Sequence, residues 1–558
     1  MDRLALFSAW LFSILRVLTP VFDWDMYWHL ANGREMVNTG RLVSEEVFSY
    51  THFGEKFDNH EWLGQIIFYL IWHNLGPYGL LCFKLLATSI VVLLLYRTIR
   101  AVGGQPWLAA VLCVFAVLAG SPRYVERPEL FSLLNTALLS FILYGFRTNQ
   151  LPRRLLWLVP LILVVWDWLH GSVYGLVLFS LFVAGENAKH FLPVLRHQQS
   201  LSQDNLKYLN RCFAVAISAM LLNPLGLLSY RHFFVLASGI SGANKINELQ
   251  PIWVVWSDCI PYILLLVWAA LLSLRNIRRL DITQLMVLLV FGYAGLRYNR
   301  VMGVFAIILV PIIASLITVN MQNARFRMEA KLHTLMVIMA AVFTIGYRLD
   351  NEFHDVRNVF LNIMVEEENL PVGSVRFVKA MGLTGNLYNS GQFGGYLAYY
   401  LTPERKIFQY NMPPIFGDTF HRPEELRRWD INYAIVGVGH EMAMFTTDEW
   451  AKIYADPYAL LAIRRTPQNQ ALISQYEIRY FHPLMGKEKL VDMFANPEIL
   501  PTLIFEMGVY LAYIRDDGIA DLWAETLANS PSLRSSPRIQ QLLQLALRYN
   551  NTGKMAQL

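Results

Sequence analysis

Long apolar runs constrain the fold of this chain more than any other feature of its sequence. Of its 558 residues, 55% are hydrophobic and only 16% are charged. A helix needs roughly 20 mostly apolar residues to cross a bilayer, so the runs predict a polytopic α-helical membrane protein with about 11 spans. The runs lie near residues 4–22, 78–98, 106–120, 128–146, 155–169, 172–188, 210–225, 258–274, 282–297, 300–320 and 333–348.

Basic residues gather in alternate connections between these runs, which predicts how the chain is oriented. Cytoplasmic loops carry an excess of Lys and Arg, so we expect a cytoplasmic N-terminus and an extracytoplasmic C-terminal part. The net charge of +5 comes mostly from these loops, and no nucleic-acid partner is predicted. The residues assigned to the cytoplasmic side are Arg97, Arg100, Arg147, Arg153, Arg154, Lys189, Arg196, Lys207, Arg211, Arg275, Arg278, Arg279, Arg325, Arg327 and Lys331.

The composition changes after the last apolar run. Three short β-prone runs cover 386–389, 406–410 and 433–437, and they alternate with helical runs at 396–401, 424–429 and 448–454. Such alternation predicts a small α/β domain with a mostly parallel sheet. We therefore expect three parts: a transmembrane domain over 1–348, an extracytoplasmic α/β domain over 350–480 and a helical segment over 481–558.

The segment 23–65 follows the first apolar run and is predicted to lie outside the membrane. Asp23 and Asp25 stand at its start, and a helical pattern covers 27–37 and ends before Gly40. Ionisable groups at a membrane boundary are costly to place there and usually functional. We interpret 23–65 as a catalytic loop with Asp25 and Asp23 as the candidate catalytic acids. The alternative is that these acids cap the helix that follows them.

Arginines in the outer connections run against the trend that places basic residues inside. Arg123 and Arg127 lie between the third and fourth apolar runs, and Arg297 and Arg300 lie between the ninth and tenth. Guanidinium groups bind phosphate through paired hydrogen bonds, so we expect these arginines, together with His29, to bind a lipid phosphate. In the structural alternative, the side chains extend to lipid headgroups or pair with neighbouring acids. Those acids are Glu126 and Glu129.

Four further residues of the outer segments are predicted to bind substrate: His60, Glu61, Asp167 and His170. Asp167 and His170 flank a turn beside Trp166 and Trp168, which suits either sugar stacking or anchoring at the membrane interface. In a second predicted role, His60 and Glu61 bind a divalent cation, Mg or Mn. The other ligands of that cation would be Asp25 and Asp58; alternatively, residues 58–61 cap a helix that begins at Trp62.

These pieces suit the transfer of a sugar from a polyprenyl-phosphate carrier. A carboxylate would accept the proton of an acceptor hydroxyl as that hydroxyl attacks the anomeric carbon. The arginines would hold the departing phosphate and stabilise its charge. An inverting reaction needs one base and no covalent intermediate, so a single well-placed acid is sufficient.

The residues 23–34 and Thr39-Gly40-Arg41-Leu42 resemble the first outer loop of the GT-C superfamily of membrane glycosyltransferases. The resemblance implies a GT-C fold, a polyprenyl-linked sugar donor, a catalytic acid at Asp23 or Asp25 and a place in the bacterial inner membrane. It supplies no acceptor, which is a glycan, a lipid or a protein. A group of bacterial GT-C-like membrane proteins is similar in the ordered motifs Phe48-Ser49-Tyr50-Thr51, His60-Glu61-Trp62-Leu63, Arg127-Pro128-Glu129, Leu169-His170-Gly171-Ser172, Asn223-Pro224-Leu225-Gly226 and Gly394-Gly395-Tyr396-Leu397.

Residues 389–396 stand where oligosaccharyltransferases carry a Trp-Trp-Asp-Tyr-Gly signature. This chain lacks the paired tryptophans and the aspartate, so peptide recognition of that type is not expected. Two other classes of function compete with glycosyl transfer: a membrane transporter or flippase, and a non-catalytic scaffold for envelope glycan assembly. A transporter would carry ionisable residues at mid-bilayer and broken helices in matching halves.

Overall fold

The computed structural model describes residues 2–21, 23–230, 247–278, 280–321, 369–411, 423–445, 448–550 and 554–558, with the single positions 359, 365, 367 and 552. Contacts within the chain define two compact units. Unit 1 comprises Met1–Asp23, Asn32–Ser44 and Asp58–Glu366. Unit 2 comprises Trp24–Ala31, Glu45–Phe57 and Glu367–Leu558. The predicted boundaries at residues 348 and 480 stay predictions.

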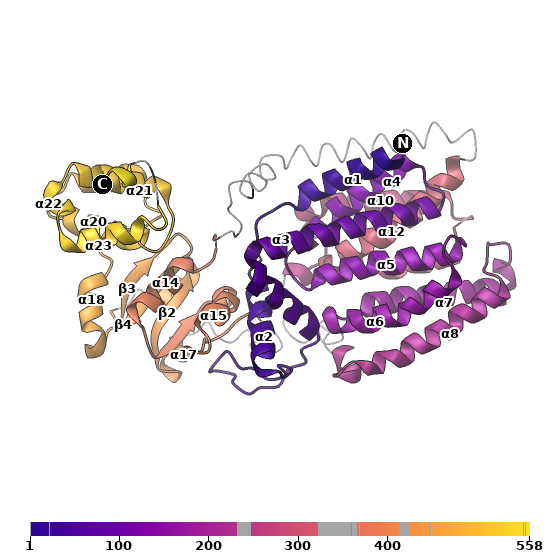
Figure 1. Cartoon of the computed structure of the whole chain (residues 1–558), viewed down its shortest axis with the longest axis horizontal. Helices are drawn as coiled ribbons and strands as arrows, with labels where there is room; N and C mark the ends of the chain where they lie inside the picture. Colours follow the sequence, from indigo (N-terminus) through magenta and orange to yellow (C-terminus); the bar gives the residue numbers. More distant parts are fainter. Residues whose placement is uncertain are drawn as a thin grey trace. The chain divides into compact units, whose positions relative to one another are not determined.

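Unit 1 is built from helices, which the apolar runs predicted (Figure 1). Ten of the predicted runs overlap helices in the described part of the chain, and the run at 333–348 lies outside the described residues. These helices are α1 (Asp2–Val17), α3 (Trp62–Ala101), α4 (Pro106–Gly120), α5 (Glu129–Arg147), α6 (Leu158–Leu169), α7 (Val173–Phe191), α8 (Gln203–Ala219), α10 (Ile260–Arg275), α11 (Ile282–Arg297) and α12 (Met302–Met321).

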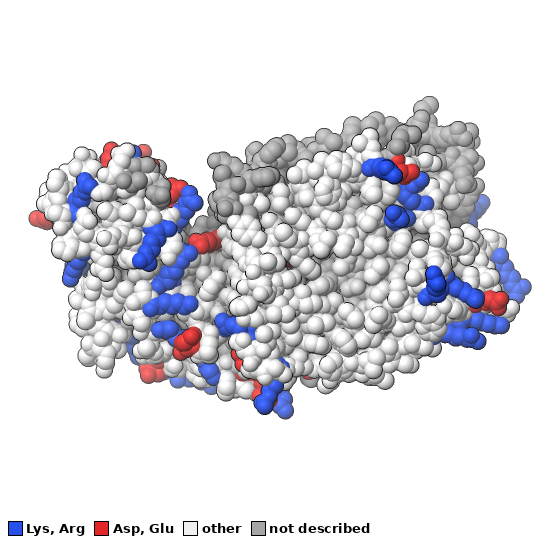
Figure 2. Space-filling view, in the orientation of Figure 1, with Lys and Arg blue, Asp and Glu red and all other residues white. Residues whose placement is uncertain are grey.

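Four stretches of the described residues are long and apolar enough to cross a bilayer: Trp62–Ala101, Pro106–Arg123, Glu129–Arg147 and Asn299–Val319. The last of them lies at the centre of unit 1, where the side chains of residues 304–314 are almost wholly buried. Over most of its width, the face of unit 1 shown in Figure 2 carries no charged side chain. The chain is a multi-pass membrane protein, and the count of about 11 spans stays a prediction.

The segment after α1 folds as its sequence predicts. Helix α2 (Met26–Thr39) contains the predicted helix, and Gly40 ends it with a φ of +65°, a conformation that glycine adopts without strain. Helix α3 begins at Trp62, as the capping interpretation of residues 58–61 expected, but the Glu61 side chain at its N-cap forms no capping hydrogen bond. The helix starts well before the apolar run at 78–98. Its first part, which precedes that run, ends in a kink at Gly76, next to Pro77.

Unit 2 contains a four-stranded sheet in the order β1-β2-β4-β3. Its strands are β1 (Asn386–Asn389), β2 (Ile431–Gly437), β3 (Trp450–Ala455) and β4 (Ala459–Arg464). The predicted strands at 386–389 and 433–437 are confirmed. The predicted mostly parallel sheet is wrong, because only β1 and β2 pair in parallel while β4 is antiparallel to both β2 and β3.

The error arises from a tight hairpin between β3 and β4. The Asp456 side chain accepts hydrogen bonds from the backbone N–H groups of Tyr458 and Ala459, at 3.0 and 2.7 Å. Such a turn reverses the chain within a few residues, so the run at 448–454 is a strand and not the predicted helix. The predicted strand at 406–410 stays outside the sheet and pairs instead through a single bridge between Ile407 and Ser49.

Helices complete unit 2. The predicted helical runs at 396–401 and 424–429 are confirmed as α15 (Gly394–Leu401) and α17 (Pro423–Arg428). Pro497 lies between α19 and α20, and Pro531 and Pro537 begin α22 and α23. Trp523 is buried among the last helices and donates a hydrogen bond to the Ile504 carbonyl oxygen at 2.8 Å. The remaining helices are α14 (Val372–Met381), α18 (Gln470–Tyr476), α19 (Lys487–Phe494), α20 (Leu500–Leu511), α21 (Asp517–Ala528), α22 (Pro531–Arg534) and α23 (Pro537–Ala546).

Candidate functional site

A cluster of arginines and carboxylates lies in unit 1 at the N-terminal end of α5. We call it the Asp23 cluster. Its groups come from the connections between the longer helices, which include short 3-10 helices, or from the first residue of α5, so they are far apart in sequence. Its members are Asp23, Arg123, Arg127, Glu129, Glu248 and Arg300.

Arg127 joins two acids of this cluster. Its Nε donates to Asp23 Oδ2, and its terminal nitrogen lies 2.7 Å from Glu248 Oε1. Asp23 is almost fully buried, whereas the Glu248 side chain is 25% exposed. The structure therefore brings Asp23, one of the two predicted acids, to Arg127, one of the predicted phosphate-binding arginines.

Arg123 lies beside Arg127 and shares one of its partners. Its guanidinium nitrogens lie 3.1 Å from Glu248 Oε1, 3.6 Å from Glu129 Oε2 and 2.9 Å from the Asn299 side-chain oxygen. Within the described part of the chain, its buried Nε has no hydrogen-bond acceptor. The alternative in which Arg123 pairs with a neighbouring acid is thus confirmed for Glu129, yet this arginine keeps one buried donor to spare.

Arg300 contacts a histidine that in turn meets an acid. The Arg300 guanidinium lies 3.3 Å from His170 Nε2, and the same ring nitrogen lies 3.3 Å from Glu61 Oε1. His60 Nε2 is 3.6 Å from that carboxylate oxygen. The structure therefore groups four of the predicted site residues, which are separated by up to 240 positions in the sequence.

Burial controls the protonation of this group. It raises the pKa of Glu61 to about 7, although the nearby Arg300 and Arg127 oppose the shift. Burial also lowers the pKa of His60 to about 4, and Arg300 acts in the same direction. Near neutral pH, His60 is thus uncharged and Glu61 can exchange a proton, which is the property required of an acid–base group.

Hydrogen bonds fix the orientation of His170. Its Nδ1 lies 2.8 Å from the Ser132 hydroxyl, which also accepts a hydrogen bond from the Trp166 indole at 2.7 Å. All three side chains are buried. This chain of polar contacts holds the other ring nitrogen of His170 toward Glu61 and Arg300.

Asp167 serves as an anchor for a turn. Its carboxylate accepts hydrogen bonds from the Asn223 side chain at 2.6 Å, from the Ser229 hydroxyl at 3.1 Å and from the backbone and hydroxyl of Ser172, each at 3.2 Å. These contacts tie the Asn223-Pro224-Leu225-Gly226 motif to the end of α6. The predicted role of Asp167 in substrate binding stays a prediction.

Three predicted residues have other surroundings. Asp25 and His29 belong to unit 2, where the His29 N–H donates to the Asp25 carbonyl oxygen at 3.3 Å at the start of α2. Among the described residues Arg297 forms no ion pair, and its guanidinium lies 5.0 Å from the ring centroid of Tyr298. Arg297 and Arg300 were predicted to bind together. In the described structure only Arg300 belongs to the Asp23 cluster.

A buried lysine, Lys84, lies beside the Asp23 cluster and was not among the predicted site residues. Lys84, in the middle of α3, lies 2.5 Å from Glu126, and both side chains are inaccessible to solvent. The Lys84 ammonium also donates to the Thr19 hydroxyl at 2.8 Å. A single lysine within an apolar run marks a functional or structural site, and this signal was available in the sequence. The pair fixes the residue next to Arg127.

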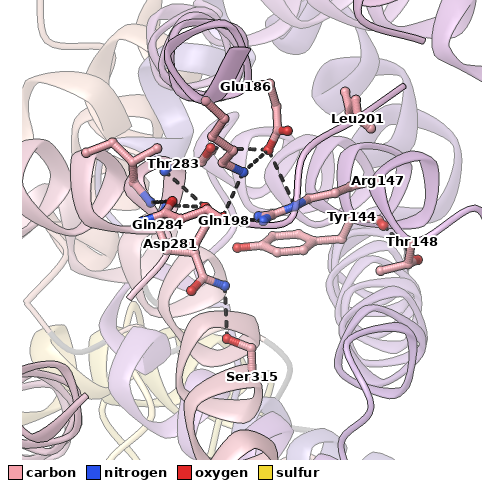
Figure 3. Close-up of polar contacts among 12 residues, drawn as sticks. Tyr144, Arg147, Thr148, Glu186, Gln198, Leu201, Asp281, Thr283, Gln284 and Ser315 are labelled. Atoms are coloured by element: carbon pink, nitrogen blue, oxygen red, sulfur yellow. Dashed lines mark hydrogen bonds and ion pairs between the residues drawn. The ribbon is translucent and has the colours of Figure 1, made fainter. Parts of the chain in front are cut away.

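A second charged cluster, which we call the Arg147 cluster, lies at the other end of α5 (Figure 3). Lys189 lies 2.6 Å from Glu186 and 2.7 Å from Asp281. Arg147 contacts both of these acids. The Thr283 hydroxyl donates to Glu186 at 3.2 Å, and Asp281 also caps α11. Two residues assigned to cytoplasmic loops, Arg147 and Lys189, are thus engaged in ion pairs, and Lys189 is fully buried.

A divalent cation does not fit the donors brought together here. In the described part of the chain, no group of three or more His, Cys, Asp or Glu residues is arranged to hold a metal ion. The Arg300 guanidinium lies beside His170 and would repel a cation bound near Glu61. A need for Mg or Mn stays a prediction.

No protein-family model and no curated protein sequence matches this chain. Solved structures do. The oligosaccharyltransferase of Archaeoglobus fulgidus, tethered to an acceptor peptide, superposes with a TM-score of 0.52 and 11% identity over 83% of this chain and 74% of that chain. Its apo form gives 0.50 and 12% over 84% and 75%.

ArnT from Cupriavidus metallidurans, bound to undecaprenyl phosphate, gives a TM-score of 0.45 and 12% identity over 83% of this chain and 98% of that chain. This score is below the value at which two folds are taken as the same. The archaeal oligosaccharyltransferase and ArnT are GT-C superfamily membrane glycosyltransferases. The likeness to the archaeal enzyme confirms the GT-C fold that the sequence motifs implied.

Proposed function

We propose that this protein is a membrane glycosyltransferase that moves a sugar from a polyprenyl-phosphate donor to an acceptor. The observation that carries the proposal is the contact between Asp23 and Arg127, in a chain that has the GT-C fold. The acid directly follows the first helix and meets an arginine from a distant connection. The proposal includes about 11 spans, a cytoplasmic N-terminus and a reaction at the extracytoplasmic face of a bacterial inner membrane.

Asp25 or Asp23 would act as the general base. An acceptor hydroxyl oxygen would form a bond to the anomeric carbon, and the carboxylate would take the hydroxyl proton. The bond between the anomeric carbon and the phosphate oxygen would break, and the phosphate would leave with the electron pair. Arg123, Arg127 and Arg300 would stabilise its negative charge, with His29 and Arg297 as the further predicted contacts.

His60, Glu61, Asp167 and His170 would position the sugar. Trp62 and Trp168 support this role because their ring centroids lie 5.8 Å apart, next to Glu61 and Asp167 in sequence. Among the described residues, neither buried indole N–H has an acceptor. A sugar offers both hydroxyl acceptors for such donors and an apolar face for the rings.

The acceptor would not be recognised as a peptide is recognised by oligosaccharyltransferases, since the corresponding residues do not offer the same groups. Asn389 stands at this place and is fully buried. Its side chain donates to the Gln409 carbonyl oxygen at 2.7 Å and accepts from the Phe408 N–H at 2.9 Å. We propose a hydroxyl acceptor on a glycan or a lipid.

Turnover of a lipid-linked sugar in native membranes tests the proposal. Asp23→Asn and Asp25→Asn keep the size of each side chain and remove the base. At least one of them should slow transfer by about 10²–10⁴-fold, the usual contribution of a general base. The control is Asp517→Asn, which alters an exposed ion pair with Arg515.

Unchanged glycan products in both Asp23→Asn and Asp25→Asn would contradict the catalytic assignment and favour a scaffold. The need for a cation is checked in the same assay by chelation, followed by addition of Mg or Mn. Restored transfer after the addition would establish a metal requirement that the described donors do not explain.

A further inference from the structure

We propose that the Glu248 carboxylate is the resident anion of the phosphate site: it competes with a phosphate group for Arg123 and Arg127 and thereby sets the affinity of the site. The inference deepens the proposed function and rests on it, because the phosphate concerned is that of the lipid carrier, which the transfer releases as a monoester. It makes Glu248 a residue that determines binding, whereas its position in the sequence predicted no role.

The geometry around Glu248 is that of an anion site. One carboxylate oxygen, Oε1, lies 2.7 Å from a nitrogen of Arg127 and 3.1 Å from a nitrogen of Arg123. The two arginines come from the connection before α5, whereas Glu248 lies in the short helix Asn247–Leu249. An oxygen that bridges two guanidinium groups has the contacts that a phosphate oxygen would make.

Glu248 supplies one of the negative charges that offset the arginines of the Asp23 cluster. Arg123, Arg127 and Arg300 face the carboxyl groups of Asp23, Glu129 and Glu248, and Glu61 also lies near Arg300 and Arg127. Arginines offset by carboxylates attract a phosphate only weakly, and the loss of the Glu248 charge makes the cluster more positive. A phosphate would therefore bind well only where a carboxylate has been displaced.

Exposure identifies which carboxylate can be displaced. The Glu248 side chain is 25% exposed, compared with 4% for Asp23 and 2% for Glu129. The backbone just after Glu248 is fixed, because the Gln250 carbonyl oxygen accepts a hydrogen bond from the Asn299 N–H at 3.1 Å. Exchange of anions would thus require a rotation of the Glu248 side chain and no rearrangement of the helices.

Arg123 offers a donor that Glu248 leaves unused. The Arg123 side chain is 7% exposed, and its buried Nε has no acceptor within the described part of the chain. A carboxylate supplies two oxygens, whereas the polyprenyl phosphate that the proposed transfer releases is a monoester and supplies three. The larger anion could engage this Nε in addition to the contacts that it takes over from Glu248.

Attraction to the arginines keeps the Glu248 carboxyl group ionised. Burial alone would raise the pKa of Glu248, but Arg127, Arg123 and Arg300 together hold that pKa well below its ordinary value. The carboxylate is thus ionised at every pH at which a membrane enzyme would work. Its competition with phosphate therefore persists across that range.

Binding of phosphate to the purified full-length protein tests the inference. Two probes are used in phosphate-free buffer: inorganic phosphate, and a polyprenyl phosphate in detergent micelles. Glu248→Gln keeps the shape of the side chain and removes its charge, so affinity for polyprenyl phosphate should rise at least about tenfold. A parallel rise for inorganic phosphate shows that the site binds the phosphate group alone, and a rise for the lipid only shows that the chain is needed.

Two further variants make the result decisive. Glu248→Asp keeps the charge but is one methylene shorter, so it should bridge the arginines less well and give an intermediate rise. Glu525→Gln, at an exposed pair with Lys554, is the control for a lost negative charge and should change nothing. Unchanged affinity in both Glu248 variants, or an equal rise in Glu525→Gln, would overturn the inference.

The outcome is separable from that of the proposed function, because binding is measured without sugar transfer. Tighter binding by Glu248→Gln together with no transferase activity in wild-type membranes would support the inference and contradict the function. Transfer that depends on Asp23 or Asp25, combined with unaltered phosphate affinity in the Glu248 variants, would do the reverse.

Discussion

The two charged clusters at the ends of α5 differ in how completely they are enclosed. In the Arg147 cluster, Lys189 and Glu186 are inaccessible to solvent, and the side chains of Asp281 and Arg147 are 13% and 15% exposed. Most of its groups lie on helices or cap them, and two cations face two acids. The Asp23 cluster is assembled mainly from connections and retains a partly exposed carboxylate at Glu248.

This difference indicates different roles. A buried set of charges in which every cation meets two acids has no capacity for a ligand, and it stabilises one arrangement of the helices. A set built on connections, with an exposed acid and a spare buried donor, can exchange a partner. Binding residues are commonly found on connections that a rigid scaffold positions, and here α5 carries both sets.

The largest effect is expected on stability at the Arg147 cluster. Glu186→Gln leaves Arg147 and Lys189 with a single acid, and removal of one partner from a buried ion pair costs about 3–5 kcal/mol. Thermal unfolding of the purified protein in detergent measures the loss. Glu525→Gln at the exposed pair with Lys554 serves as its control and should unfold like the wild type. Equal unfolding temperatures for the two variants would contradict a structural role for this cluster.

The next effect is expected on catalysis at the Asp23 cluster. Arg127→Gln removes a charge that the proposed reaction uses to stabilise the leaving phosphate, and the loss of one such donor costs about 10²–10³-fold in rate. Arg127→Lys keeps the charge but cannot reach both Asp23 and Glu248 from one rigid group, so a smaller loss is expected. Steady-state transfer from the lipid-linked donor measures both. A rate for Arg127→Gln within about twofold of wild type would remove Arg127 from the site.

The sequence predicted the fold of unit 1 well because its signals are local. Apolar runs predicted the helices, and a glycine with a φ of +65° ended α2 where expected. The sheet of unit 2 was predicted less well. Its topology depends on the turn at Asp456, whose side-chain hydrogen bonds were not apparent from a pattern that also suits a helix at 448–454.

For the site, the sequence predicted residue types and a nearby partner such as Glu129, but not the partners that are distant in sequence. Asp23, Arg123 and Arg127 were identified from their position in outer connections. Glu248, the common partner of the two arginines, is 121 positions from Arg127, and no local pattern links residues that far apart. Lys84 is a different case. Its charge within an apolar run is visible in the sequence and indicates a site without any knowledge of its partner.

The Glu61 carboxyl is expected to make the free energy of unfolding depend on pH, with an effect of intermediate size. Its pKa is about 7 in the folded protein, against an ordinary value of 4.5, so the folded state binds the proton more tightly than the unfolded state. The resulting stabilisation is complete below about pH 4.5 and is lost as the pH rises through 7, by roughly 3 kcal/mol. Glu61→Gln cannot lose a proton and should therefore gain stability relative to wild type between about pH 5 and pH 8.

Unfolding temperatures at several pH values across this range measure the gain. The control is Glu525→Gln, whose difference from wild type should stay constant with pH. Parallel curves for Glu61→Gln and wild type would show that the Glu61 carboxyl is solvated and that its proton is not held by burial.

The smallest effects come from two glycines, and they compare the clusters directly. A Cβ on Gly64 would lie 2.5 Å from the Leu169 carbonyl oxygen, next to His170. A Cβ on Gly185 would lie 2.6 Å from Thr283 Cα, next to Glu186. In both places backbone must move to admit one methyl group, so each alanine variant should lose about 1–3 kcal/mol of stability.

The two glycine variants should differ in activity although they share this cost. Gly185→Ala shifts α7 against α11 in the Arg147 cluster, so the folded fraction of the protein should transfer sugar at the wild-type rate. Gly64→Ala moves the start of α3 away from the end of α6 and lengthens the 3.3 Å contact between Glu61 and His170, so transfer per folded molecule should fall as well. Active fractions are normalised by the amount of folded protein that elutes from a sizing column. If both variants retained wild-type turnover per folded molecule, the close approach at Gly64 would serve packing alone, and Glu61 and His170 would act independently of each other.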